Sequence, residues 1–166
     1  EAPKVRELLL RSYVEFDAFI SSVKRQYDQP RPYMLDASLG DGLPTKVSDS
    51  STPSRFSAQL TLLALSLTDL AAPADIPILD TQEDFPKLRE QAIAFSEANL
   101  EYAYNFPHDL TEGARLASAF HQALLGSPEY QSLLREARSE WQGQIEPAFP
   151  SAVLSSVNQA AGLPDE

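Results

Sequence analysis

Residues 53–73 read PSRFSAQLTLLALSLTDLAAP and form the most apolar run of the chain. Leucine and alanine occupy neighbouring positions of this run, so in a helix their side chains would point in all directions and not form a single apolar face. This pattern is typical of a helix buried on several sides. Ser66, Thr68 and Asp69 interrupt the run before it reaches the roughly 20 apolar residues of a membrane span. We therefore expect a central buried helix and no membrane span.

The first residues of this run are polar and begin with Pro53 and Ser54. A proline and a serine at a helix start place a hydroxyl and unpaired backbone N–H groups at one point, which is suited to binding an anion. The alternative interpretation is an ordinary N-cap formed by Ser54. The function then depends on which other residues converge on this point.

Length and composition restrict the fold and the partners. The 166 residues, of which 43% are hydrophobic, are expected to form one domain over 1–166 with its own core. A net charge of −11 argues against nucleic acid or an anionic membrane surface as a partner. The absence of cysteine excludes disulfides and cysteine-bound metals, and we expect no metal and no cofactor. Because Glu1 follows no initiator methionine or targeting segment, we expect a processed or trimmed chain.

Apolar spacing predicts further helices on both sides of the central one. Residues repeat at three- and four-residue intervals over 5–27, 86–104, 109–125 and 128–141, with Asp109 placed to cap its helix. Residues 28–52 show no period and are expected to form a long surface loop. The tail 145–166 is expected to be less regular, with one helical turn at 152–159. No strand pattern is present, so the predicted class is all-α, a compact bundle of about five main helices.

Three polar segments can carry chemistry. The first is KRQYDQPRP at 24–32, the second is PSRFS at 53–57, and the third is NLEYAYNFPHDLTEGAR at 99–115. Lysine and arginine in the first segment can bind phosphate, or they can simply be cations placed favourably at a helix C-terminus. The third segment, taken alone, is a turn between two helices.

Taken in this order, the segments resemble the class A bacterial acid phosphatases, relatives of the type 2 phosphatidic acid phosphatases and the vanadium haloperoxidases. The signature of that superfamily is K-x6-R-P, then P-S-G-H-S, then S-R-x5-H-x3-D. The matching positions are Lys24, Arg31, Pro32, Pro53, Ser54, Ser57 and Asp109. The resemblance covers about residues 5–143. It implies the helical acid-phosphatase fold, phosphate binding by Lys24, Arg31 and Ser54, and a periplasmic or secreted location.

Both catalytic histidines of the signature are replaced. The histidine that protonates the leaving alcohol corresponds to Phe56, which cannot transfer a proton. The histidine that takes up the phosphoryl group corresponds to Asn105, whose amide is not a competent nucleophile. The resemblance therefore implies a pseudoenzyme with no catalytic residues.

Further positions of the signature also differ. Asn99 stands where the signature has arginine, and Arg55 stands where it has glycine. We expect Arg55 either to join the phosphate-binding residues or to pair with Asp109. His108 directly precedes Asp109 and is expected to face differently from the lost nucleophile, while His121 lies inside a predicted helix and is expected to be either a packed or a surface histidine.

Three hypotheses follow for the function. The first is a non-enzymatic protein that binds phosphate or a phosphorylated small molecule through Lys24, Arg31, Ser54 and Arg55. The second is a purely structural subunit that contacts a protein partner or a second copy of itself. The third is an active phosphomonoesterase with a rearranged site.

Overall fold

The computed structural model describes residues 2–40, 47–72 and 86–148, and every regular element in these ranges is helical. The elements are α1 (Pro3–Lys24), α2 (Pro32–Leu35), the 3-10 helix η1 (Ala37–Gly40), α3 (Arg55–Ala71), α4 (Pro86–Glu101), α5 (Pro107–Leu125) and α6 (Pro128–Ala148). The predicted all-α class is thereby confirmed. The helical turn predicted at 152–159 lies outside the described residues.

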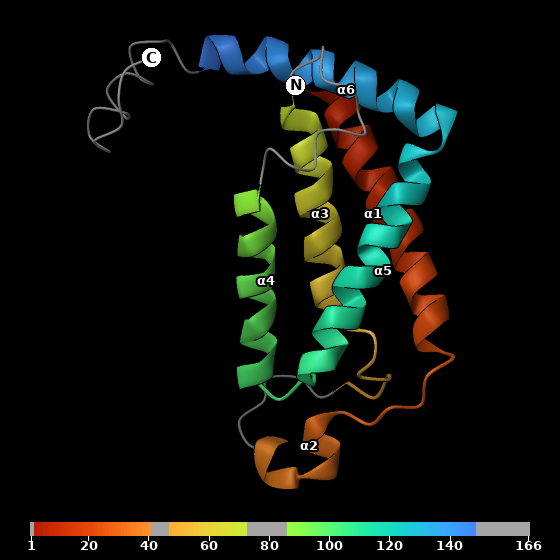
Figure 1. Cartoon of the computed structure of the whole chain (residues 1–166), viewed down its shortest axis with the longest axis vertical. Coiled ribbons are helices and arrows are strands. Elements are labelled where there is room, and N and C mark those ends of the chain that lie inside the picture. Colours follow the sequence, from red (N-terminus) through yellow and green to blue (C-terminus); the bar gives the residue numbers. More distant parts are fainter. Residues whose placement is uncertain (1, 41–46, 73–85, 149–166) are drawn as a thin grey trace, which may run out of the picture.

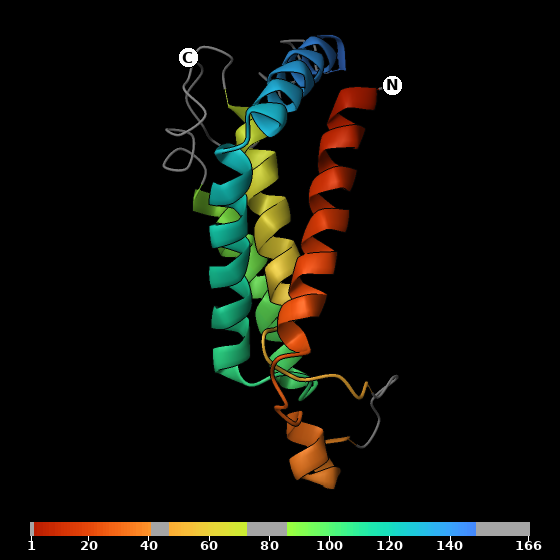
Figure 2. The same cartoon turned by 90° about the vertical axis from the view of Figure 1, so that its right-hand side faces the viewer.

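Helix α3 is the centre of the bundle, as predicted. It contacts α1, α4, α5 and α6. Helices α1, α3, α4 and α5 run alongside one another, and α6 crosses one end of them (Figures 1 and 2). We call the end covered by α6 the tail end. The opposite end, where α3 begins and α2 lies, is called the head end.

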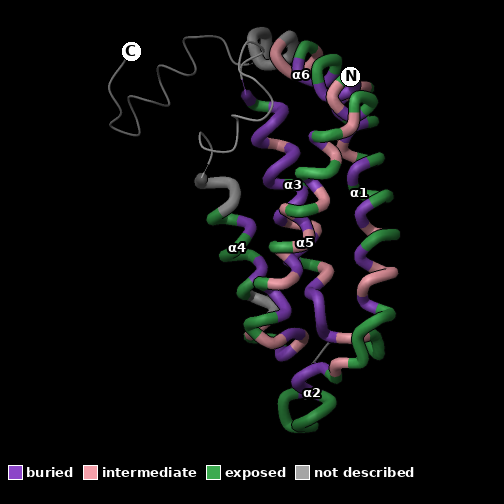
Figure 3. Tube along the Cα trace, turned by 45° about the vertical axis from the view of Figure 1, so that its right-hand side comes forward, coloured by how far each residue is buried: buried purple, intermediate pink, exposed green. Residues whose placement is uncertain are grey.

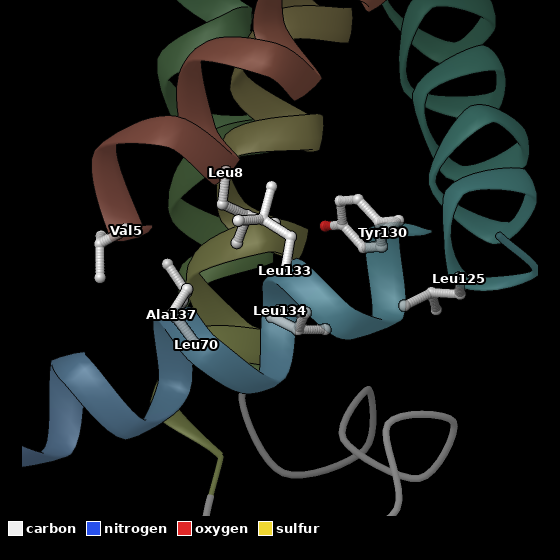
Figure 4. Close-up of a cluster of buried hydrophobic side chains, with 8 residues drawn as sticks. All are labelled: Val5, Leu8, Leu70, Leu125, Tyr130, Leu133, Leu134 and Ala137. Carbon is white, nitrogen blue, oxygen red and sulfur yellow. The ribbon is translucent and has the colours of Figure 1, made fainter. Parts of the chain in front are cut away.

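Apolar side chains fill two core clusters along the bundle, and the buried residues follow the inner faces of the helices (Figure 3). The tail-end cluster joins α1, α3, α5 and α6 and consists of Val5, Leu8, Leu70, Leu125, Tyr130, Leu133, Leu134 and Ala137 (Figure 4). The second joins α1, α3 and α5 and consists of Phe16, Ile20, Ala58, Leu62 and Ala117. Burial of each large side chain contributes roughly 1.5–3 kcal/mol, which stabilises the packing of these helices.

The surface of α3 is less uniformly buried than its composition suggests. Phe56 and Leu63 are exposed on one side, whereas the rest of the helix is buried or half-buried except at Ala71. None of the helices in the described ranges has the length and apolarity needed to cross a membrane. This agrees with the interpretation of residues 53–73 as a core helix.

Several predicted boundaries were wrong. Helix α1 ends at Lys24 instead of about residue 27, α4 ends at Glu101 instead of about residue 104, and α6 continues to Ala148, into the tail that was expected to be less regular.

The predicted loop 28–52 contains α2 and η1. Helix α2 begins at Pro32, because proline lacks a backbone N–H and the first residue of a helix needs no N–H donor within the helix. Helix α5 begins at Pro107 for the same reason, two residues before the predicted start. Asp109 therefore lies inside the first turn, where its carboxylate accepts a hydrogen bond from the Phe106 N–H at 2.7 Å.

A glycine allows α5 to contact the start of α3. A Cβ atom on Gly113 would lie 2.4 Å from the carbonyl oxygen of Ser54 and 3.2 Å from the backbone nitrogen of Ala58. Any larger residue would push the two helices apart. This close contact positions the head of α3 against α5 and thereby brings Ser54 next to the residues that precede α5.

Candidate anion site at the head end

Lys24 is the last residue of α1 and is almost completely buried, with 4% of its side chain exposed. Its ammonium group donates hydrogen bonds to the carbonyl oxygens of Ser50 and Pro53. It also lies 3.6 Å from Oδ2 of Asp49. Burial lowers the pKa of Lys24; the nearby Asp49 carboxylate opposes that effect and the Arg31 charge adds to it.

Arg31 directly precedes α2 and contacts the same segment. Its side chain is 8% exposed. Nε donates to the carbonyl oxygen of Asp49 at 3.2 Å, and Nη1 donates to that of Tyr104 at 2.7 Å. Nη2 donates to Oδ1 of Asp49 and, at 3.4 Å, to the carbonyl oxygen of Ser50. Arg31 therefore ties the segment before α3 to the residues that precede α5.

Asp49 bridges the two cations, with one carboxylate oxygen directed to each of them. Its side chain is 46% exposed, in contrast to both cations. Partial burial alone would raise the pKa of Asp49. The hydrogen bond from Arg31 and the charges of Lys24, Arg31 and Arg55 outweigh that effect and hold the pKa below its usual range. Asp49 is therefore a carboxylate at neutral pH.

Ser54 and Asn105 form a neutral pair beside the cations. Ser54 caps α3, as the alternative sequence interpretation stated, because its Oγ accepts a hydrogen bond from the Ser57 N–H at 3.3 Å. The same Oγ donates to Oδ1 of Asn105 at 3.3 Å, and Nδ2 of Asn105 donates to the Ser51 carbonyl oxygen at 2.7 Å. Asn105 thus acts as a clamp between the start of α3 and the segment before it.

Asp109 is fully buried and fixes the same segment from α5. Oδ1 accepts a hydrogen bond from the hydroxyl of Thr52, and the backbone oxygen accepts from the Ser54 N–H at 2.9 Å. Nε2 of His108 lies 3.1 Å from Oδ1, but the His108 side chain is 57% exposed. His108 therefore lies on the outer, solvent-exposed side of Asp109.

These residues form what we call the head cluster: Lys24, Arg31, Asp49, Thr52, Ser54, Asn105 and Asp109. Five of them were selected from the sequence, and the structure brings those five together from α1, the loop, α3 and α5. Asp49 and Thr52 were missed. They belong to a segment without periodicity, and no sequence signal distinguishes them from their neighbours.

Arg55 and Phe56 were also selected from the sequence, and both lie outside the head cluster. Arg55 does not pair with Asp109; its guanidinium donates to Asp17 at 2.8 Å and to the Ser21 hydroxyl at 2.9 Å, both on α1. The guanidinium group can reach both acceptors because α1 packs beside the start of α3. Phe56 is 45% exposed and lines a groove between α1 and α3. The side chain of Asn99 lies outside the described residues.

A second polar cluster, the tail cluster, consists of Asp69, His121, Tyr130 and Arg138. Nε2 of His121 lies 2.7 Å from Oδ2 of Asp69, and both side chains are fully buried. Nε of Arg138 donates to the Asp69 carbonyl oxygen at 2.6 Å. Burial, followed by the Asp69 charge, raises the pKa of Tyr130 to about 12. This cluster offers no surface to a substrate and holds α3, α5 and α6 together.

Two grooves open beside α3. The groove between α1 and α3 has a cavity volume of about 370 Å³ and is lined mainly by Leu10, Tyr13, Phe56, Leu60 and Leu63. The groove between α4 and α5 has a volume of about 590 Å³ and is lined by Ile93, Ser96, Leu100, Leu110, Thr111 and Arg115 among others. Neither groove is lined by Lys24, Arg31 or Asp49. The head cluster is therefore a separate polar site.

In its described part, the chain has no group of three or more histidine, aspartate or glutamate side chains arranged to hold a metal ion. Comparison with protein-family models, with curated proteins and with solved structures found no match to this chain.

Proposed function

We propose that the protein is a non-enzymatic binder of phosphate or of a phosphorylated small molecule, with the acid-phosphatase-like signature reduced to its anion-binding part. Lys24 and Arg31 supply the charge at the head cluster. Ser54 and Asn105 supply neutral hydrogen-bonding groups next to it. In this proposal the protein is periplasmic or secreted, as the resemblance implies.

One observation supports the proposal above the others. Two nearly buried cations from different elements, Lys24 and Arg31, meet at one carboxylate that faces solvent. Burying two cations side by side is costly, and it is offset when an anion bridges them. A water-accessible position that attracts one anion into contact with both cations is also suited to a tetrahedral oxyanion, which Nη2 of Arg31 and the ammonium group of Lys24 can contact.

The same geometry argues against turnover. By the resemblance, Asn105 corresponds to the nucleophile, and both ends of its amide are occupied by hydrogen bonds. By the same resemblance, Phe56 corresponds to the general acid, and it lies in the groove between α1 and α3. Neither group can transfer a proton or accept a phosphoryl group. We expect no hydrolysis of p-nitrophenyl phosphate above background, with or without His108→Ala.

Binding is tested by isothermal titration calorimetry and thermal unfolding with inorganic phosphate, sulfate and vanadate. At about 100 times its dissociation constant, a ligand that binds only the folded state stabilises it by roughly 2.7 kcal/mol. We expect a rise of several degrees in Tm for a domain of this size. Lys24→Met should remove this rise, because methionine keeps most of the buried stem but carries no charge.

Arg55→Ala is the matched control for the charge change. Arg55 is also a cation at the start of α3, but it is bonded to Asp17 and Ser21 on α1. This variant should keep most of the affinity for phosphate. Folded wild-type protein that shows no heat of binding and no change in Tm at millimolar phosphate would overturn the proposal. If Lys24→Met and Arg55→Ala lose the same amount of phosphate affinity, Lys24 does not form the binding site.

A structural subunit is the second candidate, favoured by the apolar groove between α1 and α3. Tyr13, Phe56 and Leu63 line it and are each between 44% and 50% exposed. Exposed apolar side chains gathered in one place are typical of contact surfaces. Sedimentation of the wild type and of a Phe56→Ser, Leu63→Ser variant tests for self-association; a wild type that stays monomeric at high concentration argues against a second copy at this groove.

A further inference from the structure

The Asp49 side chain occupies the position that the proposed oxyanion would need. One of its oxygens accepts a hydrogen bond from Nη2 of Arg31, and the other lies 3.6 Å from the ammonium group of Lys24. A phosphate that bound between Lys24 and Arg31 would have to use the same donors. Phosphate and the Asp49 carboxylate therefore exclude one another.

The backbone of the segment that carries Asp49 is held independently of the Asp49 carboxylate. The carbonyl oxygens of residues 49, 50, 51 and 53 accept hydrogen bonds from Arg31, Lys24 and Asn105. The N–H groups of Ser51 and Ser54 donate to backbone oxygens elsewhere in the chain. The carboxylate can consequently leave the cations by a side-chain rotation while the segment stays in place.

The exposure of the three side chains supports this direction of movement. Asp49 is 46% exposed, whereas Lys24 and Arg31 are 4% and 8% exposed. Water can solvate the carboxylate once it turns outward. The two cations cannot follow, since their donors are bonded to the backbone of the segment. Outward rotation would leave two positive charges facing a solvent-accessible position.

We infer that Asp49 is an internal ligand of Lys24 and Arg31, and that a phosphate dianion binds by replacing the Asp49 carboxylate. This inference rests on the proposed function and adds a form of regulation to it. The Asp49 carboxylate competes with anions for the site and so lowers the affinity of the chain for them. The apparent affinity for phosphate equals the affinity of the open site multiplied by the fraction of molecules in which Asp49 is turned away. The exchange replaces one negative charge by two beside the same pair of cations, so it favours dianions over monoanions such as acetate.

The test is the affinity for inorganic phosphate of the wild type, Asp49→Asn and Asp49→Ala, measured by titration calorimetry at fixed pH and ionic strength. Asparagine keeps the shape of the side chain and removes its charge, and alanine removes both. We expect each variant to bind phosphate roughly tenfold more tightly than the wild type. Asp28→Asn is the control, because Asp28 is exposed, carries the same charge and lies four residues after Lys24.

Each outcome decides between the two claims. If the wild type binds and both Asp49 variants bind no more tightly than Asp28→Asn, the internal ligand is disproved and the proposed function stands. Phosphate binding by the Asp49 variants alone supports the internal ligand, and it shows that the unmodified chain is not a phosphate binder. If none of the folded proteins binds phosphate, both claims fail.

Discussion

The two ends of α3 each carry a buried polar cluster, and the clusters differ in where their charges find partners. In the tail cluster, Asp69 and His121 are both fully buried and face each other. In the head cluster, Lys24 and Arg31 are buried, but the carboxylate that pairs with them is half exposed. A buried charge by itself therefore does not identify a binding site. The accessibility of its partner is the informative property.

The clusters also differ in the segments that supply their partners. The tail cluster joins three packed helices, α3, α5 and α6. The head cluster takes most of its acceptors from the irregular residues 49–53. Segments of this kind rearrange at lower cost than helices packed on several sides. We therefore expect the tail cluster to contribute mainly stability, and the proposed ligand binding concerns the head cluster alone.

The largest expected effect is the loss of stability on removing the carboxylate of the tail cluster. Asp69→Ala removes a buried partner of His121 and leaves an empty volume, which should lower the free energy of unfolding by about 3 kcal/mol. Urea denaturation measures the loss. Asp17→Ala is the control, because the Asp17–Arg55 pair is partly exposed and its loss should cost less than about 1 kcal/mol. Equal losses would remove the distinction between the two kinds of pair.

A smaller effect is expected from separating the head cluster from α5. In Gly113→Ala the new Cβ meets the Ser54 carbonyl oxygen and must displace the start of α3, at a cost of about 2 kcal/mol. Phosphate affinity should fall as well, because Ser54 moves. Gly126→Ala is the control: its Cβ would lie 3.3 Å from the nearest heavy atom, at ordinary helical dihedral angles. If both variants unfold at the same urea concentration, the close contact does not limit stability.

The smallest effect concerns acid. The pKa of Asp49 is lower in the folded chain than its ordinary value of 3.8, so the stability from this ionised group is present above that value. The stability is lost as the pH falls through the folded-state pKa. The Tm difference between wild type and Asp49→Asn, measured without phosphate, should therefore shrink as the pH falls below about 3.8. A constant difference below this pH would show that Asp49 gains nothing from Lys24 and Arg31.

Most of the fold followed from local sequence patterns. Three- and four-residue apolar spacing predicts each main helix because burial of one face drives helix packing. The boundaries were less predictable. Asp109 carries the signature of a cap, but Pro107 can begin the helix earlier because a proline at the first helical position loses no hydrogen bond. The short helix α2 could not be predicted, because four residues are too few to show a helical repeat of apolar side chains.

The candidate site was only partly predictable. The resemblance selected Lys24, Arg31 and Ser54, and these do lie together at the start of α3. It could not indicate that Asp49 would bridge the cations or that Arg55 would turn to Asp17, since both depend on how distant segments pack. The spacing of residues along the chain does not indicate such long-range pairings.

The tail cluster left a partial signal. Asp69 stands in an otherwise apolar helix, and a buried aspartate requires a partner. The sequence does not say which residue that partner is. His121 lies 52 positions further along the chain, and only the parallel packing of α3 and α5 brings the two together. Of the two expectations for His121, a packed or a surface histidine, the structure therefore shows the packed one.

Two backbone amides of the head end outside any helix give access to its dynamics. The N–H of Ser51 is bonded to the Gln29 carbonyl oxygen and that of Ser54 to the Asp109 carbonyl oxygen, each at 2.9 Å, and both residues are fully buried. Their protons can exchange with deuterium only when the segment detaches from its neighbours. Rotation of Asp49 alone breaks neither bond. Exchange at these two amides thus separates the turning of one side chain from the opening of the whole segment.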